Sequence, residues 1–180
     1  MGTIKTTNIE PIADNGTVTL GSSGDTITVP TGVTVAGSMA NTPGFNAYQN
    51  AALGTTLTQN TATKVVFDSE YYDTDSAFSS GRFTVPSGKA GKYFFTSSIT
   101  MRDAYANISI YFYKNGSRWL RGGNMNSDIG STQTVTGEID LSVGDYVEVF
   151  VQQNQSTNRA EGIVNNATHS YFSGHRLIGV

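Results

Sequence analysis

The residue types that could perform catalysis gather near the end of the sequence, in the stretch HSYFSGHRLIGV. His169 and His175 are the two histidines of this 180-residue chain, and Ser170 and Ser173 lie beside them. With one of the many aspartates they could form a Ser–His–Asp hydrolase triad. No nucleophile elbow or metalloprotease motif accompanies them, and such sets arise by chance in a chain so rich in serine. The sequence therefore predicts a protein that is not an enzyme and uses no cofactor.

The acidic stretch FDSEYYDTD is the second candidate for chemistry. It brings together four carboxylates, those of Asp68, Glu70, Asp73 and Asp75. Hard oxygen ligands suit Ca²⁺, which takes about 6–8 of them. The spacing fits no calcium-loop signature, so a solvated acidic turn is the simpler interpretation. We predict no metal site and keep these residues as weak candidates for calcium.

Composition excludes several classes of function. The net charge is -3 and charged residues make up 14%, so no basic face is expected for nucleic acid. The chain has no cysteine, which excludes disulfides and thiolate chemistry. The start, MGTIKTTNIEP, lacks the apolar core of a secretory signal, and no run approaches the ~18 apolar residues that span a membrane. We expect neither nucleic acid binding nor membrane insertion.

Two regions of different composition meet near the turn signal NTPG at Asn41–Gly44. All nine Phe, all nine Tyr and the single Trp lie at or after Phe45. The region before it contains three short alternating pairs, Val18/Leu20, Ile27/Val29 and Val33/Val35. Strands this short, with so few apolar side chains, cannot offset the entropy of ordering the segment alone. Residues 1–44 are either a disordered linker or, as we favour, a segment ordered by other copies of the chain or by a docking partner.

Residues 45–180 show strand patterns throughout, with alternating apolar residues and regular turns. The expected strands are Phe45–Tyr48, Lys64–Glu70, Gly81–Val85, Gly91–Arg102, Asn107–Gly116, Ser117–Gly123, Thr132–Leu141, Asp145–Gln153 and Ser170–Gly179. Strands of this length and spacing are typical of a β-sandwich or jelly roll.

Short and long loops alternate along these strands. The tight turns are Pro86–Gly91, Asn115–Ser117 and Ser142–Asp145, and the more open loops are Asp103–Ala106, Gly122–Ser131 and Asn154–His169. In an antiparallel sandwich consecutive loops fall at opposite ends, so the open loops should share one distal end. Long polar loops on a rigid scaffold are the usual place for binding. The candidates there for a receptor or glycan are Tyr105, Asn124, Asn126, Asp128, Asn158, Arg159, Asn165 and Asn166.

Six short motifs follow one another along residues 45–180: FNAY, VVFD, GRFTVPSGKAGKYFF, YKNG, LSVGDYVEV and YFSGHRL. In their order and spacing they resemble the globular head of complement first component q (C-one-q), in the tumour-necrosis-factor-like jelly-roll superfamily. The resemblance implies an all-β, ten-stranded jelly-roll sandwich that forms a homotrimer. It also implies that the closing strand lies mid-sheet, on the face near the three-fold axis. Animal members carry a collagen stalk, whereas this chain has no Gly-X-Y repeat.

The segment TVTLGSSGDTITVPTG (Thr17–Gly32) is similar to the short Thr/Gly-rich β-repeats of bacteriophage fibre and spike proteins. The two resemblances together suggest a trimeric anchor and stem in residues 1–44 and a jelly-roll knob in residues 45–180. The expected function is that of a virion fibre, spike or decoration protein. It would dock to other virion proteins through residues 1–44 and bind a host-surface glycan or protein through the knob. The alternative is a secreted or surface lectin-like module of a bacterium, against which the absence of an export signal counts.

The closing strand can be assigned two faces by alternation. Phe172 and Ile178 would pack between the sheets, while Arg176 on that face needs an acidic partner or a position near the rim. The resemblance implies that the other face looks toward the three-fold axis, with Tyr171, His175 and Leu177 on it. Family members usually have an apolar residue where this chain has His175. Charged imidazoles around an axis would repel one another, so we expect neutral rings there, packed or water-bridged. A three-His metal site is the alternative.

Overall fold

The computed structural model describes residues 18–33, 41–50, 56–128, 130–155, 163 and 169–178. Contacts divide the chain into two compact units, Met1–Val35 and Ala36–Val180. The regular elements of the described residues are β-strands. No helix found in this part of the chain is long and apolar enough to cross a membrane.

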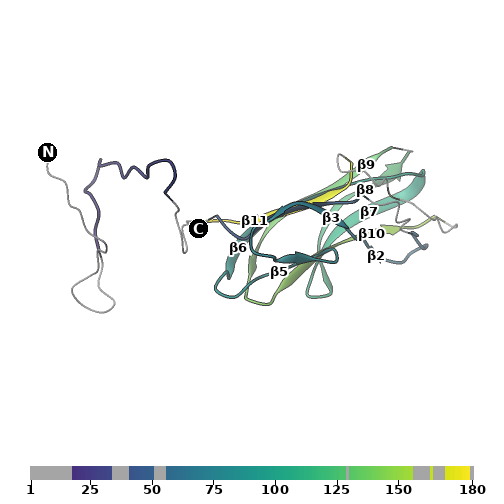
Figure 1. Cartoon of the computed structure of the whole chain (residues 1–180). Coiled ribbons are helices and arrows are strands. Elements are labelled where there is room, and N and C mark those ends of the chain that lie inside the picture. The colour runs from purple at the N-terminus through teal and green to yellow at the C-terminus, as the bar shows by residue number, and fades with distance from the viewer. Residues whose placement is uncertain are drawn as a thin grey trace. The chain divides into compact units, whose positions relative to one another are not determined.

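The second unit is a sandwich of two antiparallel sheets (Figure 1). Sheet I has the order β3-β1-β11-β6-β9, built from Ser69–Asp73, Gly44–Tyr48, Tyr171–Arg176, Gly91–Thr100 and Thr132–Leu141. Sheet II has the order β4-β5-β10-β7-β8, built from Phe78–Ser79, Arg82–Thr84, Tyr146–Gln153, Tyr105–Lys114 and Ser117–Ser127. The short β2 (Thr63–Lys64) pairs with β10. The predicted all-β sandwich is confirmed.

The last strand of the chain is the middle strand of sheet I. On one side β11 pairs with β1, and on the other with β6, so that Tyr171 lies between Tyr48 and Ser98. Its residues alternate as predicted, because Phe172 is fully buried while Tyr171 is only half-buried. Antiparallel neighbours on both sides satisfy the backbone of this strand, which explains how a chain can close on a central element.

The core between the sheets is largely aromatic. Five phenylalanines have no exposed surface: Phe45, Phe83, Phe95, Phe112 and Phe172. The Phe45 and Phe83 rings stack with centroids 5.1 Å apart, and the Phe45 and Phe172 rings meet edge to face at 4.9 Å. Both arrangements are favoured by the ring quadrupole. This core fixes the two sheets against each other and so fixes the faces that they turn outward.

The prediction of one strand over Lys64–Glu70 is wrong. The chain leaves sheet II after β2 and joins sheet I at β3, so the residues between them cross from one sheet to the other. Val65 and Phe67 are buried in that crossing. Their apolar alternation therefore reflects burial in the core and not the pairing of one strand. The short strand β4 was not expected.

Two other boundaries also differ from expectation. The strand β8 runs on to Ser127, because the 10-residue β7 offers it partners as far as Tyr105. The closing strand stops at Arg176, and Ile178 is 45% exposed, so the expected packing of Ile178 between the sheets is wrong.

In the first unit, residues 18–33 contain turns and no strand. The Asp25 N–H donates to the Ser22 carbonyl, and the Val33 N–H donates to the Pro30 carbonyl. The single chain does not form the strands expected at Val18/Leu20 and Ile27/Val29. The third expected pair includes Val35, which lies outside the described residues. The apolar side chains of this segment are exposed, Leu20 by 59% and Ile27 by 64%.

Candidate binding surfaces

The open loops meet at one end of the sandwich, which we call the distal end. The Met101 N–H donates to the Ser131 carbonyl over 2.8 Å, and the Gly130 N–H donates to the Met101 carbonyl over 2.8 Å. Met101 also forms an antiparallel bridge with Ile163, which lies in the longest of the expected loops. The structure therefore places parts of two open loops, Gly122–Ser131 and Asn154–His169, beside Met101, which precedes the third, Asp103–Ala106.

The predicted binding residues are only partly within the described structure. Asn124 and Asn126 lie on β8 and not in a loop, and both are exposed. The Asn126 Oδ1 accepts the Asn107 N–H over 3.0 Å, and exposed Asp128 directly follows the strand. Tyr105 begins β7. The side chain of Tyr105 and the whole of Asn158, Arg159, Asn165 and Asn166 lie outside the described residues.

At the opposite end one carboxylate joins two of the tight turns. Asp145 accepts hydrogen bonds from the Asn115 amide at 2.7 Å and the Ser142 N–H at 2.9 Å. Its other polar neighbour is the Lys114 ammonium at 3.0 Å. The Asn115 and Ser142 hydrogen bonds, together with Lys114, lower the pKa of Asp145 to about 2. The carboxylate therefore ties the β7–β8 turn to the β9–β10 turn.

We expect Asp145→Asn to lower the free energy of unfolding by about 1 kcal/mol at pH 7. A carboxyl group with a lowered pKa stabilises the fold above its unfolded pKa, and this contribution disappears as the pH falls through the folded value. The difference between the wild type and the variant should therefore shrink from pH 5 to pH 2 in urea unfolding. Asp140→Asn is the control, since the Asp140 side chain has no hydrogen bond within the described structure. An Asp145→Asn difference that does not change with pH would contradict this assignment.

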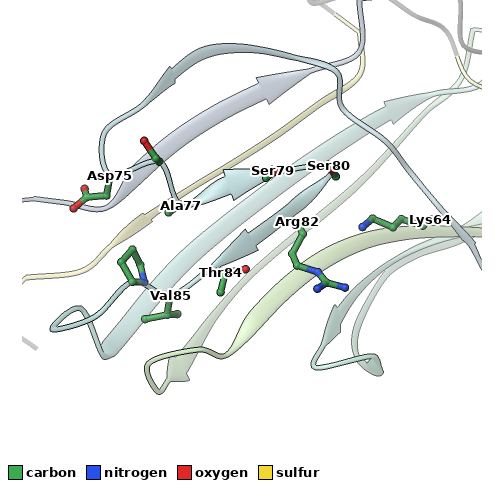
Figure 2. A pocket seen from close by; sticks show the side chains of 10 residues that line it. Lys64, Asp75, Ala77, Ser79, Ser80, Arg82, Thr84 and Val85 are labelled. Carbon is green, nitrogen blue, oxygen red and sulfur yellow. The ribbon is translucent and has the colours of Figure 1, made fainter.

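The outward face of sheet II carries one buried carboxylate between two cations. Glu148 Oε1 lies 2.6 Å from the Lys64 ammonium and 3.0 Å from the Arg82 guanidinium. Burial raises the pKa of Glu148, but the hydrogen bonds and charges of Lys64 and Arg82 outweigh it and leave this pKa below its ordinary value. Figure 2 shows the cationic ends of Lys64 and Arg82 directed toward each other. They border a hollow of about 620 Å³ between β2 and the β4–β5 edge.

A second groove, of about 280 Å³, lies on the same sheet over β7, β8 and β10. Arg118 and Arg121 line it, and both are exposed. The Arg118 Nη2 donates to the Gln152 Oε1 over 2.8 Å, and its guanidinium carbon lies 3.9 Å above the Tyr111 ring. Sequence reasoning missed this groove because it looked for binding residues in loops.

The outward face of sheet I carries Tyr171 and His175, two of the three residues predicted for the trimer axis, while Leu177 follows the end of β11. Tyr171, His175 and Leu177 are half-buried in the single chain. His175 lies opposite Gly44 on one side and Phe94 on the other, and the His175 and Phe94 rings are 5.5 Å apart.

Arg176 has the opposite orientation from His175 and lies near the tight-turn end. Its N–H donates to the Pro43 carbonyl over 3.0 Å, while its Nε is buried and has no hydrogen-bond partner within the described residues. The backbone of Gly91 leaves room for this guanidinium, because a Cβ there would lie 3.3 Å from the Nε. Burial raises the pKa of the neighbouring Tyr93 to about 12, although the charge of Arg176 opposes that rise. The sequence predicts an acidic partner for Arg176 or a position near the rim. The described part of the chain offers no acidic partner, and Arg176 is the last residue of β11, near the rim.

The acidic stretch uses its carboxylates to hold its own backbone. Asp73 accepts the Ala77 and Phe78 N–H groups at 3.0 and 2.8 Å, and Asp68 accepts the Asn50 N–H at 2.7 Å. Asp75 lies 3.4 Å from the Lys89 ammonium. Burial and the nearby Asp73 raise the pKa of Glu70. Among the described residues no group of three or more His, Cys, Asp or Glu is arranged to hold a metal ion.

The serines beside the histidines are engaged with the backbone. The Ser173 hydroxyl donates to the Phe45 carbonyl over 3.0 Å, and the buried Ser170 hydroxyl accepts the Thr100 N–H over 3.3 Å. His169 and His175 lie at opposite ends of β11, separated by the length of the strand. These contacts position the closing strand, which is a structural role.

These features define a class of protein, a two-sheet all-β sandwich whose loops and outward faces, and not a catalytic centre, are its candidate sites. The model of the C1q domain matches residues 47–177, so the chain belongs to the C1q domain family. The C1q domain is a non-enzymatic binding or structural module.

Solved structures share this fold at low sequence identity. The globular domain of zebrafish complement 1qA is 17% identical with a TM-score of 0.57, and the match covers 75% of this chain and 96% of that one. Murine APRIL at pH 8.5 is 12% identical with a TM-score of 0.56, covering 74% and 98%. The Eiger TNF of S. frugiperda is 13% identical with a TM-score of 0.56, covering 78% and 96%. No curated protein sequence matches this chain.

Proposed function

We propose that this chain is a homotrimeric binding head carried on a stem that its first 44 residues form. Domains of the C1q and tumour-necrosis-factor type typically form trimers. The observation that carries the proposal is the outward face of sheet I. Its central strands present mostly uncharged residues there, namely Asn46, Tyr48, Phe94, Thr96, Ser98, Tyr171, Ser173 and His175. The exposed Lys92 near the start of β6 is the charged residue of these strands on this face. A face that is half-buried, partly aromatic and low in charge has the character of an interface core.

The first 44 residues support the stem. Leu20, Ile27 and Val33 are 59%, 64% and 57% exposed in the single chain, so the described part of this segment does not bury its own apolar side chains. Neighbouring copies in a trimer would cover them. The similarity of Thr17–Gly32 to the repeats of bacteriophage fibres favours a virion as the carrier. The head would then lie at the surface of the particle, with residues 1–44 docked to other virion proteins.

The distal end of the sandwich is the part of the head that we propose to meet the host. The open loops lie at that end. The first strand, β1, begins at the opposite, tight-turn end of the sandwich. There the Lys89 ammonium donates to the hydroxyl of Thr42, just before β1, over 2.6 Å. Asn124, Asn126 and Asp128 expose amide and carboxylate groups at that end. Such groups form paired hydrogen bonds with the hydroxyls of a glycan.

We expect the full chain to have a native mass of about 58 kDa, which is three times its 19.2 kDa, because three sheet I faces would be buried together. Native mass spectrometry and light scattering measure this directly. A monomer would contradict the proposal.

The virion assignment needs a test of its own. Antibodies against the chain, applied to particles from a lysate of the source culture, should label fibres or spikes in electron micrographs. Label on bacterial surfaces without particles would instead favour a lectin-like module that works outside a virion.

A further inference from the structure

The groove over β7, β8 and β10 has a floor and walls built from polar side chains. Tyr111 and Ser109 form the floor and are each 5% exposed. Arg118, Arg121 and Asn124 line it from β8, and Gln152 lines it from β10. Their strand partners fix these positions, since Arg121 lies opposite Tyr111 and Asn124 lies opposite Ser109. The groove is therefore made by the rigid sheet and not by a loop.

The Arg118 side chain is held in place before any ligand arrives. Its guanidinium lies on the Tyr111 ring and donates to Gln152, and the Gln152 amide donates in turn to the Asn60 carbonyl over 3.0 Å. A side chain ordered in this way loses little conformational entropy when it binds. The remaining guanidinium N–H groups of Arg118 are free to meet a ligand.

The charge of the groove is not balanced by the described residues. No carboxylate is among the residues that line it, and neither Arg118 nor Arg121 forms an ion pair in the described structure. The other two cations on this face, Lys64 and Arg82, share Glu148. The chain as a whole has a net charge of -3, so this is a local concentration of positive charge on an acidic protein.

We propose that this groove binds a saccharide that bears a carboxylate, such as a uronic acid unit of a surface polysaccharide. A planar guanidinium matches a carboxylate through two parallel hydrogen bonds. Asn124 adds an amide that both donates to and accepts from sugar hydroxyls. The volume of about 280 Å³ suits one or two sugar rings. The inference rests on the proposed role as a binding head and names the class of ligand.

The groove remains accessible in the proposed trimer. It lies on the outward face of sheet II, whereas the proposed axis lies against the outward face of sheet I. The core separates these two faces. A trimer could therefore present three such grooves around its sides, which raises the avidity for a repeating polysaccharide.

The test uses the full chain on an array in which each carboxylated saccharide is paired with its neutral parent. We expect retention of carboxylated saccharides above their neutral partners, with binding that weakens as salt is raised. Arg118→Gln and Arg121→Gln should each weaken binding of the best carboxylated saccharide at least tenfold in a titration. The control is Arg82→Gln, which removes the same charge from the same face outside the groove and should change binding less than twofold.

Two results of the saccharide-binding measurements would overturn the inference. One is an array without preference for carboxylated saccharides, and the other is Arg118→Gln and Arg121→Gln variants that bind as the wild type does. Thermal melting of each variant separates lost binding from lost folding. The variant that lacks both arginines is also compared with the wild type for attachment to host cells. If both are trimers and attach equally well, the proposed binding head stands and this groove is ruled out. A monomer would instead count against the proposed function, and the array would still report on the groove.

Discussion

Gly174→Ala is expected to lower the free energy of unfolding of the sandwich by about 2–3 kcal/mol. Gly174 faces the core from the middle of β11, where a Cβ would lie 2.3 Å from the Phe95 Cδ1 and 3.0 Å from the Phe45 Cε1. Both rings have no exposed surface and are packed against other rings, so neither can move aside without opening the core. Gly174→Val adds two more methyl groups at this point and should prevent the chain from folding.

Thermal and urea unfolding measure the effect, and Gly44→Ala is the matched control. Gly44 also lies in a central strand of sheet I, but a Cβ there would meet its nearest atom at 3.6 Å, which is ordinary contact. We expect Gly44→Ala to change stability by less than about 1 kcal/mol. Phe95→Leu should relieve the collision, so the double variant with Gly174→Ala should be more stable than the sum of the single losses implies. Strictly additive losses would show that the collision is not the cause.

The closing strand shows what the alternation of apolar and polar side chains can predict without a structure. Its period of two assigned Phe172 to the core and Tyr171 to the outward face, and both assignments are confirmed. The same pattern gave a wrong assignment for Ile178. The strand ends at Arg176, and side chains beyond the end of a strand no longer alternate between its two faces. The end of pairing depends on the partner strands, which a local pattern does not contain.

The arginine groove shows why part of the site could not be predicted. Arg118 and Arg121 are three residues apart, and strict alternation would place them on opposite faces of β8. The pairing of β7 with β8 shifts register between Phe112 and Tyr113, so both arginines lie opposite outward-facing tyrosines. A β-bulge of this kind depends on the packing of Trp119 and Leu120 against the core. The stretch SRWLRGG gives a weak indication of this bulge, since a regular strand rarely has two adjacent large apolar residues between charged ones.

His175→Lys should dissociate the proposed trimer at neutral pH. His175 lies on the outward face of sheet I in a row with Gly44, Phe94 and Glu138, and the Tyr72 ring lies beside Gly44. Around a three-fold axis the three copies of this side chain would come close together. Two like charges about 6 Å apart repel by roughly 3 kcal/mol at an effective dielectric of about 20. The repulsion of three such pairs exceeds the free energy of association of many interfaces. The Glu138 carboxylate lies two strands away, which is too distant to compensate.

Light scattering at pH 7.5 should show the wild type as a trimer and His175→Lys as a monomer. His175→Phe is the control, since an apolar ring of similar size should keep the trimer. If His175→Phe is instead a monomer at pH 7.5, the ring contacts the other copies through its nitrogens, and the assignment of apolar packing to His175 is wrong. If His175→Lys remains a trimer, this face of sheet I does not lie at the axis, and another face of the sandwich must form the contact.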